Sequence, residues 1–522
     1  MVRKLFLGLA LGGAFALIAA STSAGGGPTL VNGASTSTCT AAQDSSQPGH
    51  VYANSTVEPQ ASVFGKHVIA MWHQDRWSNG GGHGIGVGVS GDGGTTWSSS
   101  GMPWDVCETG TPSSLTSYFR NSDPWVSFGP DGTAYASALA FNIAVPNWAN
   151  AVAVATSSDF GKTWGNVQPI PGSVFTKFAQ STDKNSTTAD PKTAGTAYTV
   201  WDTLIEPTDN PDDNPHTSSY TGPAFFSKTT DGGQTWSQAQ VIVNTNQRQQ
   251  TIGNIIVVDA RTNPHTLYDF TDLLVSPNTS LGQGTNGNAQ VAFVKSTDGG
   301  NTWSAPQVIA PFDSLGVFDP NTGQPLRVGN GLEEVAIDPT SGKLYVVWES
   351  SSNFEKNTKQ SSMFWDDQIL LATSGNGGAT WTGPKVVHQL ASGLPSYTPM
   401  VAVNGGKVAI TYYDNRNLPK GDTSNLPTDY WASVSSDGGN TFSEQHIAGS
   451  FDGMSAPVAR GFFLGDYEAL QPSGSGFLAV FVMTNCASPF DPKTNPDCGP
   501  ASSNLVPTPN TNPTSTFSAA VS

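Results

Sequence analysis

Positive charge is scarce in this chain. Its 522 residues include 23 Lys and Arg against 40 Asp and Glu, which gives a formal net charge of −17. Nucleic acids and anionic membranes need a cationic face on a protein that binds them, so this balance excludes both as expected partners.

Long apolar runs are missing after the N-terminus. Arg3 and Lys4 precede an apolar stretch from Leu5 to Ala20, and small residues follow it up to Ala24. About 16 apolar residues are fewer than the roughly 20 that a membrane-spanning helix needs. Residues 1–24 are therefore predicted to be a secretory signal peptide, with a membrane anchor as the alternative. The mature protein is expected to be secreted, soluble and monomeric.

Cysteine is rare, with four copies in the chain. In an exported protein four cysteines predict two disulfides, which can pair in three ways. Cys486 and Cys498 close a short loop and are favoured as one pair, which leaves Cys39 with Cys107. Unpaired buried thiols are the alternative.

Glycine, proline and tryptophan are abundant, with 57, 36 and 14 copies. This composition favours many short strands joined by tight turns. One pattern of eight residues also returns at spacings of 61 to 78 residues, and its copies are SGDGGTTW (90–97), SSDFGKTW (157–164), TTDGGQTW (229–236), STDGGNTW (296–303), SGNGGATW (374–381) and SSDGGNTF (435–442). A period of this size is typical of a repeat architecture.

Each copy has the chemistry of a turn between two strands. The Asp carboxylate can accept hydrogen bonds from backbone N–H groups just downstream, and Gly permits positive φ. Two strand-like segments precede the strand that leads into each turn. In the first repeat, EPQASVF and KHVIAMWH precede GIGVGVS. Four antiparallel strands per repeat predict an all-β fold, a β-propeller of four-stranded blades.

A further unit follows the sixth copy without a copy of its own. Three strand-like segments, GDYEALQ, GFLAVFVMT and STFSAAV, could be completed by an N-terminal strand near residues 28–31. Seven blades are therefore favoured over six. The propeller is expected to span residues 51–522 after an N-terminal segment at 25–50, with a Pro- and Asn-rich loop at about 487–513.

The repeated pattern S-x-D-x-G-x-T-W resembles the Asp box (BNR repeat) of the sialidase (neuraminidase) superfamily and of other Asp-box propellers. The resemblance covers residues 90–442 and implies a β-propeller. It also implies that the third position of each box has a structural role away from the active site. These positions are Asp92, Asp159, Asp231, Asp298, Asn376 and Asp437.

In a four-stranded meander, the turn between strands three and four lies at the same end as the turn between strands one and two. The loops after second strands and the starts of first strands must then gather at the opposite end. Their polar residues are interleaved acids, arginines and tyrosines, the groups that glycan chemistry needs. The candidates for substrate binding are Arg76, Arg120, Arg327, Arg416, Arg460 and Asp414. Ion pairs that join neighbouring blades are the alternative role for any one pair.

The sialidase resemblance implies further residues at this end. A Phe-Arg-Ile-Pro motif opens the first inner strand of sialidases, but Val57 stands at the position of its Arg, and Arg76 is the expected replacement. The family places its acid/base Asp near Asp75, with Asp123 as the second candidate. Its nucleophilic Tyr would be Tyr397, or Tyr467 as the alternative, with Glu333 or Glu206 as the neighbouring carboxylate.

The resemblance therefore implies a secreted exo-acting glycoside hydrolase for a terminal, anionic sugar of a glycan or glycoconjugate. The alternatives are a non-catalytic propeller that binds glycan or protein, and an enzyme with another glycan-cleaving activity. No cofactor is expected, although Asp209, Asp212 and Asp213 in an acidic loop could bind Ca²⁺. No metal site is expected at the histidines, because their spacing is not that of a zinc motif, and surface or turn positions are expected for His50, His67, His73 and His83.

Overall fold

The computed structural model describes residues 27–143, 148–210, 220–275, 289–312, 316–329, 331–351, 367–388, 390, 394–488, 498 and 514–522. The predicted signal peptide lies outside these ranges, as do Asp212 and Asp213 and most of the predicted loop at 487–513. The regular secondary structure of the described chain is almost all β-strand, which confirms the all-β prediction. Its helical segments are α1 (Ala41–Asp44) and η1 (Gly453–Ser455).

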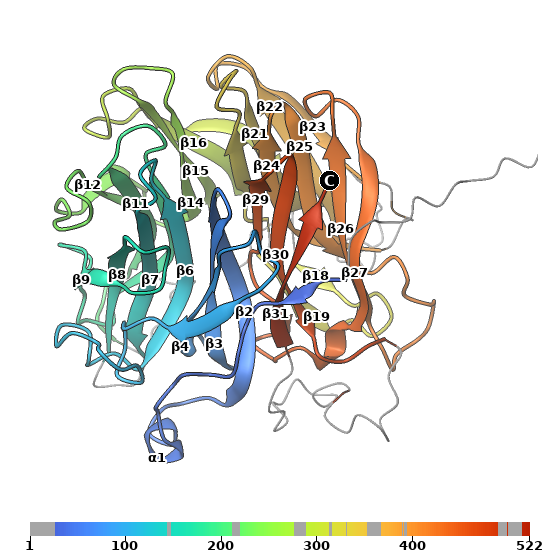
Figure 1. Cartoon of the computed structure of the whole chain (residues 1–522), viewed down its shortest axis with the longest axis horizontal. Helices are drawn as coiled ribbons and strands as arrows, with labels where there is room; N and C mark the ends of the chain where they lie inside the picture. Colours follow the sequence, from blue (N-terminus) through green and yellow to red (C-terminus); the bar gives the residue numbers. More distant parts are fainter. Residues whose placement is uncertain are drawn as a thin grey trace, which may run out of the picture.

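The strands form many four-stranded antiparallel sheets (Figure 1). Four sheets use consecutive strands: β10 (Gln180–Ala189), β11 (Ala197–Ile205), β12 (Ala224–Thr229) and β13 (Gln240–Val243); β14 (Gln249–Asp259), β15 (Thr266–Val275), β16 (Ala289–Ser296) and β17 (Gln307–Phe312); β20 (Glu334–Ile337), β21 (Leu344–Ser350), β22 (Gln368–Ser374) and β23 (Thr382–Val386); β24 (Ser396–Asn404), β25 (Lys407–Asp414), β26 (Pro427–Ser435) and β27 (Ser443–Asp452).

An eight-stranded sheet precedes them along the chain. It divides into two four-stranded halves that are linked by one pairing, Gly82 with Asn121. Its strands are β2 (Val51–Phe64), β3 (His67–Trp77), β4 (Gly82–Ser90) and β5 (Ser98–Gly101), then β6 (Arg120–Phe128), β7 (Ala134–Asn142), β8 (Ala149–Ser157) and β9 (Gly165–Pro169).

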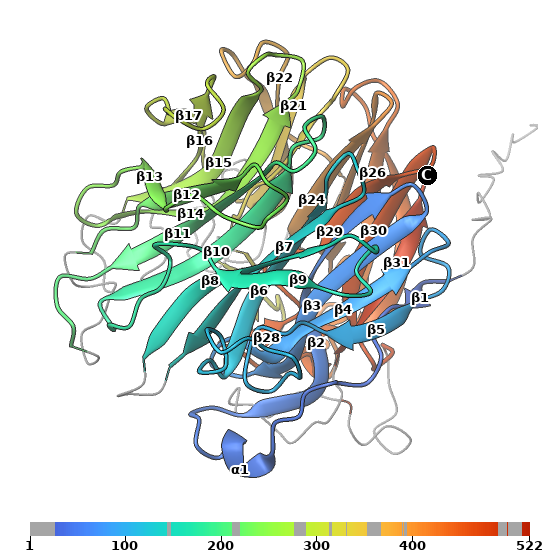
Figure 2. The same ribbon diagram turned by 60° about the vertical axis from the view of Figure 1, so that its left-hand side comes forward.

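The last sheet joins the two ends of the chain. β29 (Ala469–Ser473), β30 (Gly476–Thr484) and β31 (Thr514–Val521) are completed by β1 (Thr29–Leu30), which pairs with β31. β2 packs beside this sheet, and Thr514 donates from its hydroxyl to the carbonyl of Thr56 (2.8 Å). Figures 1 and 2 show the blue N-terminal strands beside the red C-terminal ones.

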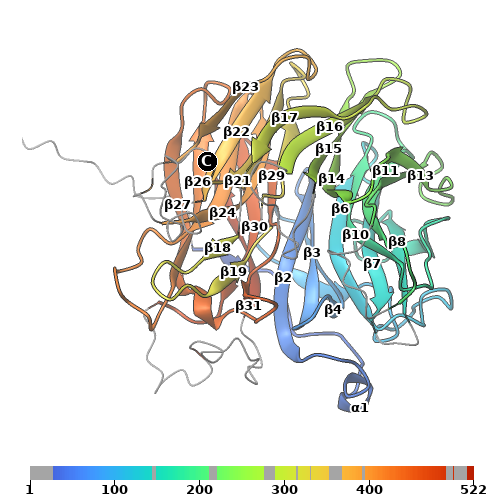
Figure 3. The same ribbon diagram turned by 180° about the vertical axis from the view of Figure 1, so that it is seen from behind.

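The first strands of successive sheets lie side by side. β2 packs against β6, β6 against β10, and the series continues through β14, β20 and β24 to β29, which packs against β2. These first strands therefore surround the middle of the molecule. A small sheet of β18 (Val317–Phe318), β19 (Pro325–Arg327) and β28 (Phe462–Phe463) lies apart from the larger sheets, and Figure 3 shows β18 and β19 from behind.

Both faces of a sheet are buried against its neighbours. In β21 the side chains of Val346 and Trp348 pack with those of β14 to β16, whereas Tyr345 and Val347 pack with those of β24 and β25. Successive side chains of a strand point to opposite faces, so a strand between two sheets must be apolar on both. This explains the uninterrupted apolar run LYVVW.

The six repeats form turns between the third and fourth strands of their sheets. In the first, Oδ1 of Asp92 accepts from the backbone N–H of Thr96 (2.9 Å) and Oδ2 accepts from its hydroxyl (2.6 Å). These bonds lower the pKa of Asp92 to about 2. In the fifth repeat Asn376 replaces Asp and donates from Nδ2 to the hydroxyl of Thr380 (2.8 Å). In each of the other repeats the backbone N–H of the corresponding threonine donates to the side-chain oxygen at the third position, which is Asp159, Asp231, Asp298, Asn376 or Asp437.

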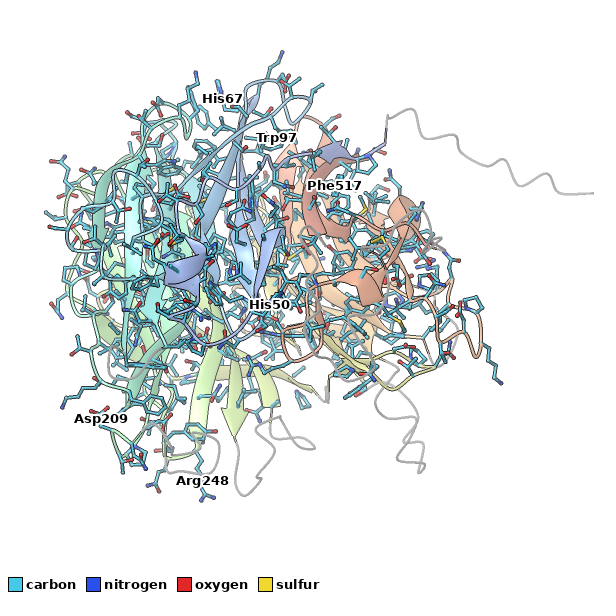
Figure 4. The ribbon with its side chains drawn as sticks, turned by 90° about the horizontal axis from the view of Figure 1, so that it is seen from below. His50, His67, Trp97, Asp209, Arg248 and Phe517 are labelled. Atoms are coloured by element: carbon cyan, nitrogen blue, oxygen red, sulfur yellow. A yellow bond between two sulfur atoms is a disulfide. The ribbon has the colours of Figure 1, made fainter. Side chains whose placement is uncertain are left out.

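These turns also join neighbouring sheets. Lys228 of β12 donates to the carbonyl of Gly299 in the next sheet (2.8 Å), and Lys343, just before β21, donates to that of Gly438 (2.8 Å). Between β31 and the first repeat, Trp97 donates from Nε1 to the hydroxyl of Ser518 (3.2 Å). Figure 4 shows Trp97 close to Phe517 of β31, with Asp209 and Arg248 at the opposite edge of that view.

The four cysteines are bonded as Cys39–Cys107 and Cys486–Cys498. The first bond attaches the segment that carries α1, which lies at the lower edge of the molecule in Figures 1 and 2. In the acidic loop predicted for calcium, Asp209 accepts from the backbone N–H of Ala179 (3.0 Å).

Candidate active site at the ends of the first strands

β-Bulges at corresponding places in the first strands position the polar residues of the centre. In β2, β6, β10, β14 and β24 the pairing register with the next strand shifts. Positive φ angles cost a residue with a side chain about 1–2 kcal/mol, so tertiary contacts must hold such residues in place. Each bulge contains one residue at positive φ, which in β14 is a glycine: Glu58 (53°), Asp123 (52°), Lys184 (39°), Gly253 (80°) and Thr398 (52°).

Glu58 and Asp123 form a buried carboxyl pair close to one nitrogen of His73. Nε2 of His73 lies 2.8 Å from Oε2 of Glu58 and 3.9 Å from Oδ1 of Asp123. NH1 of Arg76 contacts Nδ1 of the same imidazole at 3.2 Å. The exposed fractions of Glu58, His73 and Asp123 are 1%, 0% and 3%.

The pKa values of the two carboxyls of this pair are shifted in opposite directions. Burial opposes ionisation of Glu58, but the charges of Lys184, His73 and Arg76 outweigh it and hold the pKa of Glu58 well below its usual range. Burial, with repulsion from Glu58 and Asp183, raises the pKa of Asp123 to about 6. Below that pH the pair carries one proton, which resides on Asp123. Carboxyls separated in this way can act as an acid and a base in one reaction.

Lys184 connects this pair to the far side of the centre. Its Nζ lies 2.8 Å from Oδ2 of Asp466, 3.4 Å from Oε1 of Glu58 and 3.8 Å from Oδ1 of Asp123. Asp466 also accepts from NH2 of Arg327 (3.3 Å). Burial disfavours the charge of Lys184, but these carboxylates outweigh burial and raise the pKa of Lys184 above its usual value.

Two guanidinium groups lie against the ring of Phe463, and a third is close to them. The Cζ atoms of Arg76 and Arg327 are 4.6 and 4.3 Å from the ring centroid, within range of cation–π attraction. Repulsion from Arg327 is the main cause that lowers the pKa of Arg460. Arg76 is 1% exposed, and its Nε and NH2 have no hydrogen-bond partner in the described part of the chain.

A cavity of about 20 Å³ lies among the first strands. Polar side chains of β10 and of residues 333–334 line it together with two aromatic residues. Its lining includes Trp125, Lys184, Asn185, Asn254, Glu333, Glu334, Asp466 and Tyr467.

The two candidate tyrosines border different cavities. Tyr397 lines a cavity of about 10 Å³ together with Arg327, whereas Tyr467 lines the central cavity, where Nζ of Lys184 lies 4.9 Å from its ring centroid. Burial raises the pKa of both phenols. Neither hydroxyl bonds to a carboxylate among the described residues, so neither Tyr has a base that would activate it.

Glu333 faces another carboxyl instead of a tyrosine. Burial is the main cause that raises its pKa well above the usual value, and repulsion from Asp272 adds to it. The pKa of Asp272 is also raised well above the usual value, chiefly by burial, although its hydrogen bond with Glu333 opposes the rise.

Asp75 does not belong to the central group. Its Oδ2 accepts from the hydroxyl of Ser35 (2.6 Å) and contacts Nδ1 of His83 (3.1 Å), and its Oδ1 accepts from the backbone N–H of Asn54 (2.6 Å). His83 also contacts Asp44 of α1 at 2.8 Å. Asp75 therefore anchors the N-terminal segment, and Glu58 occupies the place at the centre that was predicted for it.

Two of the candidate arginines also have structural partners outside the centre. Arg120 donates to the carbonyl of Pro48 (2.6 Å), and its Cζ lies 4.1 Å from the ring centroid of Trp77. Arg416 bridges Asp414 (2.7 Å) and Glu444 (2.6 Å). Among the predicted substrate-binding residues, Arg76, Arg327 and Arg460 are thus the ones that come together.

Sequence reasoning missed Glu58, His73 and Lys184. A surface or turn position was expected for His73, but its ring is fully buried close to two carboxyls. The signal for Glu58 was the following proline, since Glu58–Pro59, Asp123–Pro124 and Thr398–Pro399 mark the bulges of three first strands. Lys184 has no such signal, because a bulge without proline cannot be recognised in one sequence.

Glu58, His73 and Asp123 also form the one group of three acidic or histidine side chains, among the residues that the structure describes, whose ligand atoms lie within 4.8 Å of one another. The positive charge that a metal ion would supply already comes from Lys184 and Arg76, which contact these three side chains. The donor set as it lies therefore does not fit a metal ion.

No known protein-family model matches this chain, and no curated protein matches it. Several solved structures are similar in shape. A protein from Dyadobacter fermentans is 10% identical, with a TM-score of 0.44, over 91% of this chain and 96% of that one. The Hadza microbial sialidase Hz136 is 15% identical, with a TM-score of 0.41, over 80% and 70%. The α-L-arabinanase of Penicillium chrysogenum, solved with arabinobiose, is 13% identical, with a TM-score of 0.41, over 70% and 91%.

No helix within the described ranges combines the length and the apolar character needed to cross a membrane.

Proposed function

We propose that this protein is a secreted glycoside hydrolase of the sialidase-like type, which removes terminal anionic sugars from glycans. The observation that carries the proposal is the buried pair of Glu58 and Asp123, in which one carboxyl is held ionised and the other holds a proton. Glycoside hydrolysis needs these two states at the same time.

Each carboxyl would have one role. Asp123 would protonate the leaving oxygen of the glycosidic bond, and Glu58 would attack the sugar or activate water. Their ligand atoms lie within 4.8 Å of each other. Retaining glycosidases hold their carboxyls about 5–5.5 Å apart and inverting ones about 6.5–9.5 Å, so the short separation favours a retaining mechanism.

The cluster of Arg76, Arg327 and Arg460 supports an anionic substrate. Guanidinium groups bind carboxylates with two parallel hydrogen bonds. The buried Nε and NH2 of Arg76 have no partner within the described residues, so this side chain has two donors for such a group.

We further propose that the sheets form a closed propeller of seven four-stranded blades. The support is the series of first strands that returns from β29 to β2, and the pairing of β1 with β31. Two disulfides support export to an oxidising compartment, where such bonds persist.

The test is turnover of a panel of fluorogenic glycosides that includes a sialoside and an arabinofuranoside. The wild-type protein should cleave an anionic substrate, and Asp123→Asn should lose about 10²–10⁴-fold in turnover. A leaving group of low pKa should recover part of that loss, because it needs no proton from Asp123. No turnover by folded wild-type protein on any substrate, or full turnover by the variant, would contradict the proposal.

One observation favours a second function, a non-catalytic propeller that binds glycan. The described residues leave a central cavity of about 20 Å³, which is much smaller than a sugar ring, so a glycan would bind on the surface and not around Asp123. A glycan array would distinguish the two: a binding protein should retain the same glycans after Asp123→Asn and release no sugar from them.

A further inference from the structure

Between η1 and β29 the chain forms a short loop, residues 457–465, which we name the strap. Two backbone bonds within it keep its shape, because the N–H of Ala459 donates to the carbonyl of Gly461 (2.9 Å) and that of Phe463 donates to the carbonyl of Pro457 (2.9 Å). A loop with internal bonds of this kind can move as one body about its ends.

The strap places Phe463 against the central arginines. The ring of Phe463 is fully buried and packs with Val57 and Ala459. The same ring contacts the guanidinium groups of Arg76 and Arg327, whose Cζ atoms lie 4.6 and 4.3 Å from its centroid. Phe463 thus blocks two of the groups that the proposed function assigns to an anionic substrate.

The strap also contacts the carboxyl pair. The N–H of Glu58 donates to the carbonyl of Leu464 (3.3 Å), and Oε1 of Glu58 accepts from the N–H of Asp466, directly after the strap (3.3 Å). Glu58 and Asp123 are 1% and 3% exposed, and the neighbouring cavity of about 20 Å³ has room for about one water. A sugar therefore reaches the pair only after part of the chain moves.

Two hydrogen bonds that attach the strap to neighbouring strands are long. NH1 of Arg327 donates to the carbonyl of Ala459 at 3.5 Å, and the bond from Glu58 is 3.3 Å, both beyond the usual range. A cavity of about 10 Å³ also borders Phe462 and Leu464, so the packing of their side chains is incomplete. β28 pairs with β19 over two residues in the small sheet, so the strap can separate from β19 without breaking a larger sheet.

Glycines stand on either side of the segment that carries Phe463. Gly461 and Gly465 have φ angles of 151° and 154°, which favour glycine. A Cβ atom on Gly461 would lie 2.7 Å from the backbone N of Arg327, and one on Gly465 would lie 2.9 Å from that of Glu58. The two glycines let the strap lie close to β19 and β2, and they give it positions about which it can turn.

We propose that the strap is an autoinhibitory lid, in which Phe463 holds the place of the substrate's anionic group at Arg76 and Arg327 until the strap lifts. This inference rests on the proposed function for the nature of the group that enters. Nε and NH2 of Arg76 are buried without a hydrogen-bond partner among the described residues, and unpaired buried donors cost free energy. An anion that pairs with them would offset the loss of the ring contacts, so the substrate itself would favour the open strap.

The experiment measures how fast phenylglyoxal, which reacts with guanidinium groups, labels Arg76 in the whole protein, by mass spectrometry of its peptides. Phe463→Leu should be labelled at least tenfold faster than the wild type, because leucine lacks the ring that contacts both arginines.

A disulfide across the small sheet tests the movement directly. Leu326 and Phe462 are register partners in β19 and β28, so Leu326→Cys with Phe462→Cys places two thiols within reach of each other. The oxidised double variant should be labelled at Arg76 at least tenfold more slowly than the wild type, and a reductant should restore at least the wild-type rate. This variant keeps the test valid if Phe463→Leu does not fold.

Arg120 and Phe481 provide the matched controls. Arg120 is also fully buried, and it contacts Trp77 (4.1 Å to the ring centroid) and the carbonyl of Pro48 (2.6 Å), which lie outside the strap. Its labelling rate should be the same in every variant. Phe481→Leu removes a buried ring that stacks on Tyr430 (4.3 Å), so it should leave the labelling of both arginines unchanged. Wild-type protein with the same reductant controls for the native disulfides.

Either of two results would overturn the inference: unchanged labelling of Arg76 in the Phe463 variant, or equal labelling of the oxidised and reduced double variant. Turnover of the anionic glycosides separates it from the proposed function, since the oxidised double variant should lose at least tenfold and regain activity on reduction. If the labelling follows the strap but no form cleaves a glycoside, the inference stands and the function fails. If the oxidised and reduced forms cleave equally fast, the function stands and the inference fails.

Discussion

Carboxylates occupy two regions of this protein and behave in opposite ways. At the repeat turns each Asp is exposed or half-buried and accepts hydrogen bonds from residues up to four positions downstream, and the pKa of Asp92 falls to about 2. At the centre the carboxyls are buried near one another. Burial is the main cause that raises the pKa of Asp123 to about 6, whereas neighbouring positive charges hold the pKa of Glu58 below its usual range.

This comparison separates two uses of the same chemical group. A turn carboxylate is satisfied by its own loop and has nothing left to offer a ligand. The central carboxyl of Asp123 keeps its proton up to about pH 6, so it can give that proton to a substrate.

The largest expected difference between the regions concerns catalysis. Glu58→Gln should reduce turnover by about 10²–10⁴-fold, because it removes the ionised member of the central pair. Asp437→Asn, at a repeat turn, should leave turnover within about twofold, since Asn376 already serves in the fifth repeat. Steady-state kinetics on the two purified variants checks this, and equal losses in both would remove the distinction.

The next effect is on pH dependence. Turnover should fall as pH rises through about 6, because Asp123 then loses its proton. Repulsion from Asp183 contributes to that raised pKa, so Asp183→Asn should move the falling limb to lower pH and reduce turnover at pH 7 by about threefold. A pH–rate profile of both proteins measures the shift, and a shift to higher pH would show that Asp183 has another role.

The same titration affects stability. A carboxyl whose pKa is raised in the folded state stabilises the fold fully below its unfolded pKa of 3.8, and this contribution is lost as pH rises through about 6. Chemical denaturation of Asp123→Asn should therefore show a weaker loss of stability between pH 4 and 6 than the wild type shows.

A smaller effect is expected at the repeat turns. Asp298→Ala should lower Tm by about 1–3 °C, because several backbone and hydroxyl donors lose their acceptor. Asp298→Asn should lower it less, since Asn376 keeps the same turn with a reversed hydroxyl bond. Calorimetric scans compare the two, and an equal loss would mean that the charge matters more than the hydrogen bonds.

The smallest effect should come from the N-terminal segment. Burial lowers the pKa of His83, but Asp75 and Asp44 outweigh it and raise that pKa above 6.5. The resulting stabilisation is complete below pH 6.5 and is lost as pH rises through the raised value. His83→Gln should therefore destabilise the protein more at pH 6 than at pH 9. Denaturant unfolding at both pH values tests this, with His67→Gln as the control.

The repeats could be read from the sequence because their bonds are local. An Asp that binds backbone groups within four residues needs no distant partner, so its pattern predicts the turn and the strand that follows. The all-β class followed from the same pattern, whereas the pairing of the last strands with an N-terminal strand was predicted from strand-like segments outside it. Arg76, Arg327 and Asp123 were also named from the sequence, from the loops after second strands and the starts of first strands.

The rest depended on long-range contacts. Asp75 and Arg76 are neighbours in β3, so their side chains point to opposite sides of the strand. Asp75 therefore contacts the N-terminal segment, and Arg76 lies at the centre. Glu58, Asp123 and Lys184 come from three strands, and only their bulges bring them into contact.

By itself the sequence determined the turns, the strands between them and their alternation, since these follow from bonds and side-chain periods within a few residues. The tertiary structure decided which carboxyls are buried together and which of them keep a proton. That outcome depends on burial and on charges from distant strands, and no short stretch of the chain contains them.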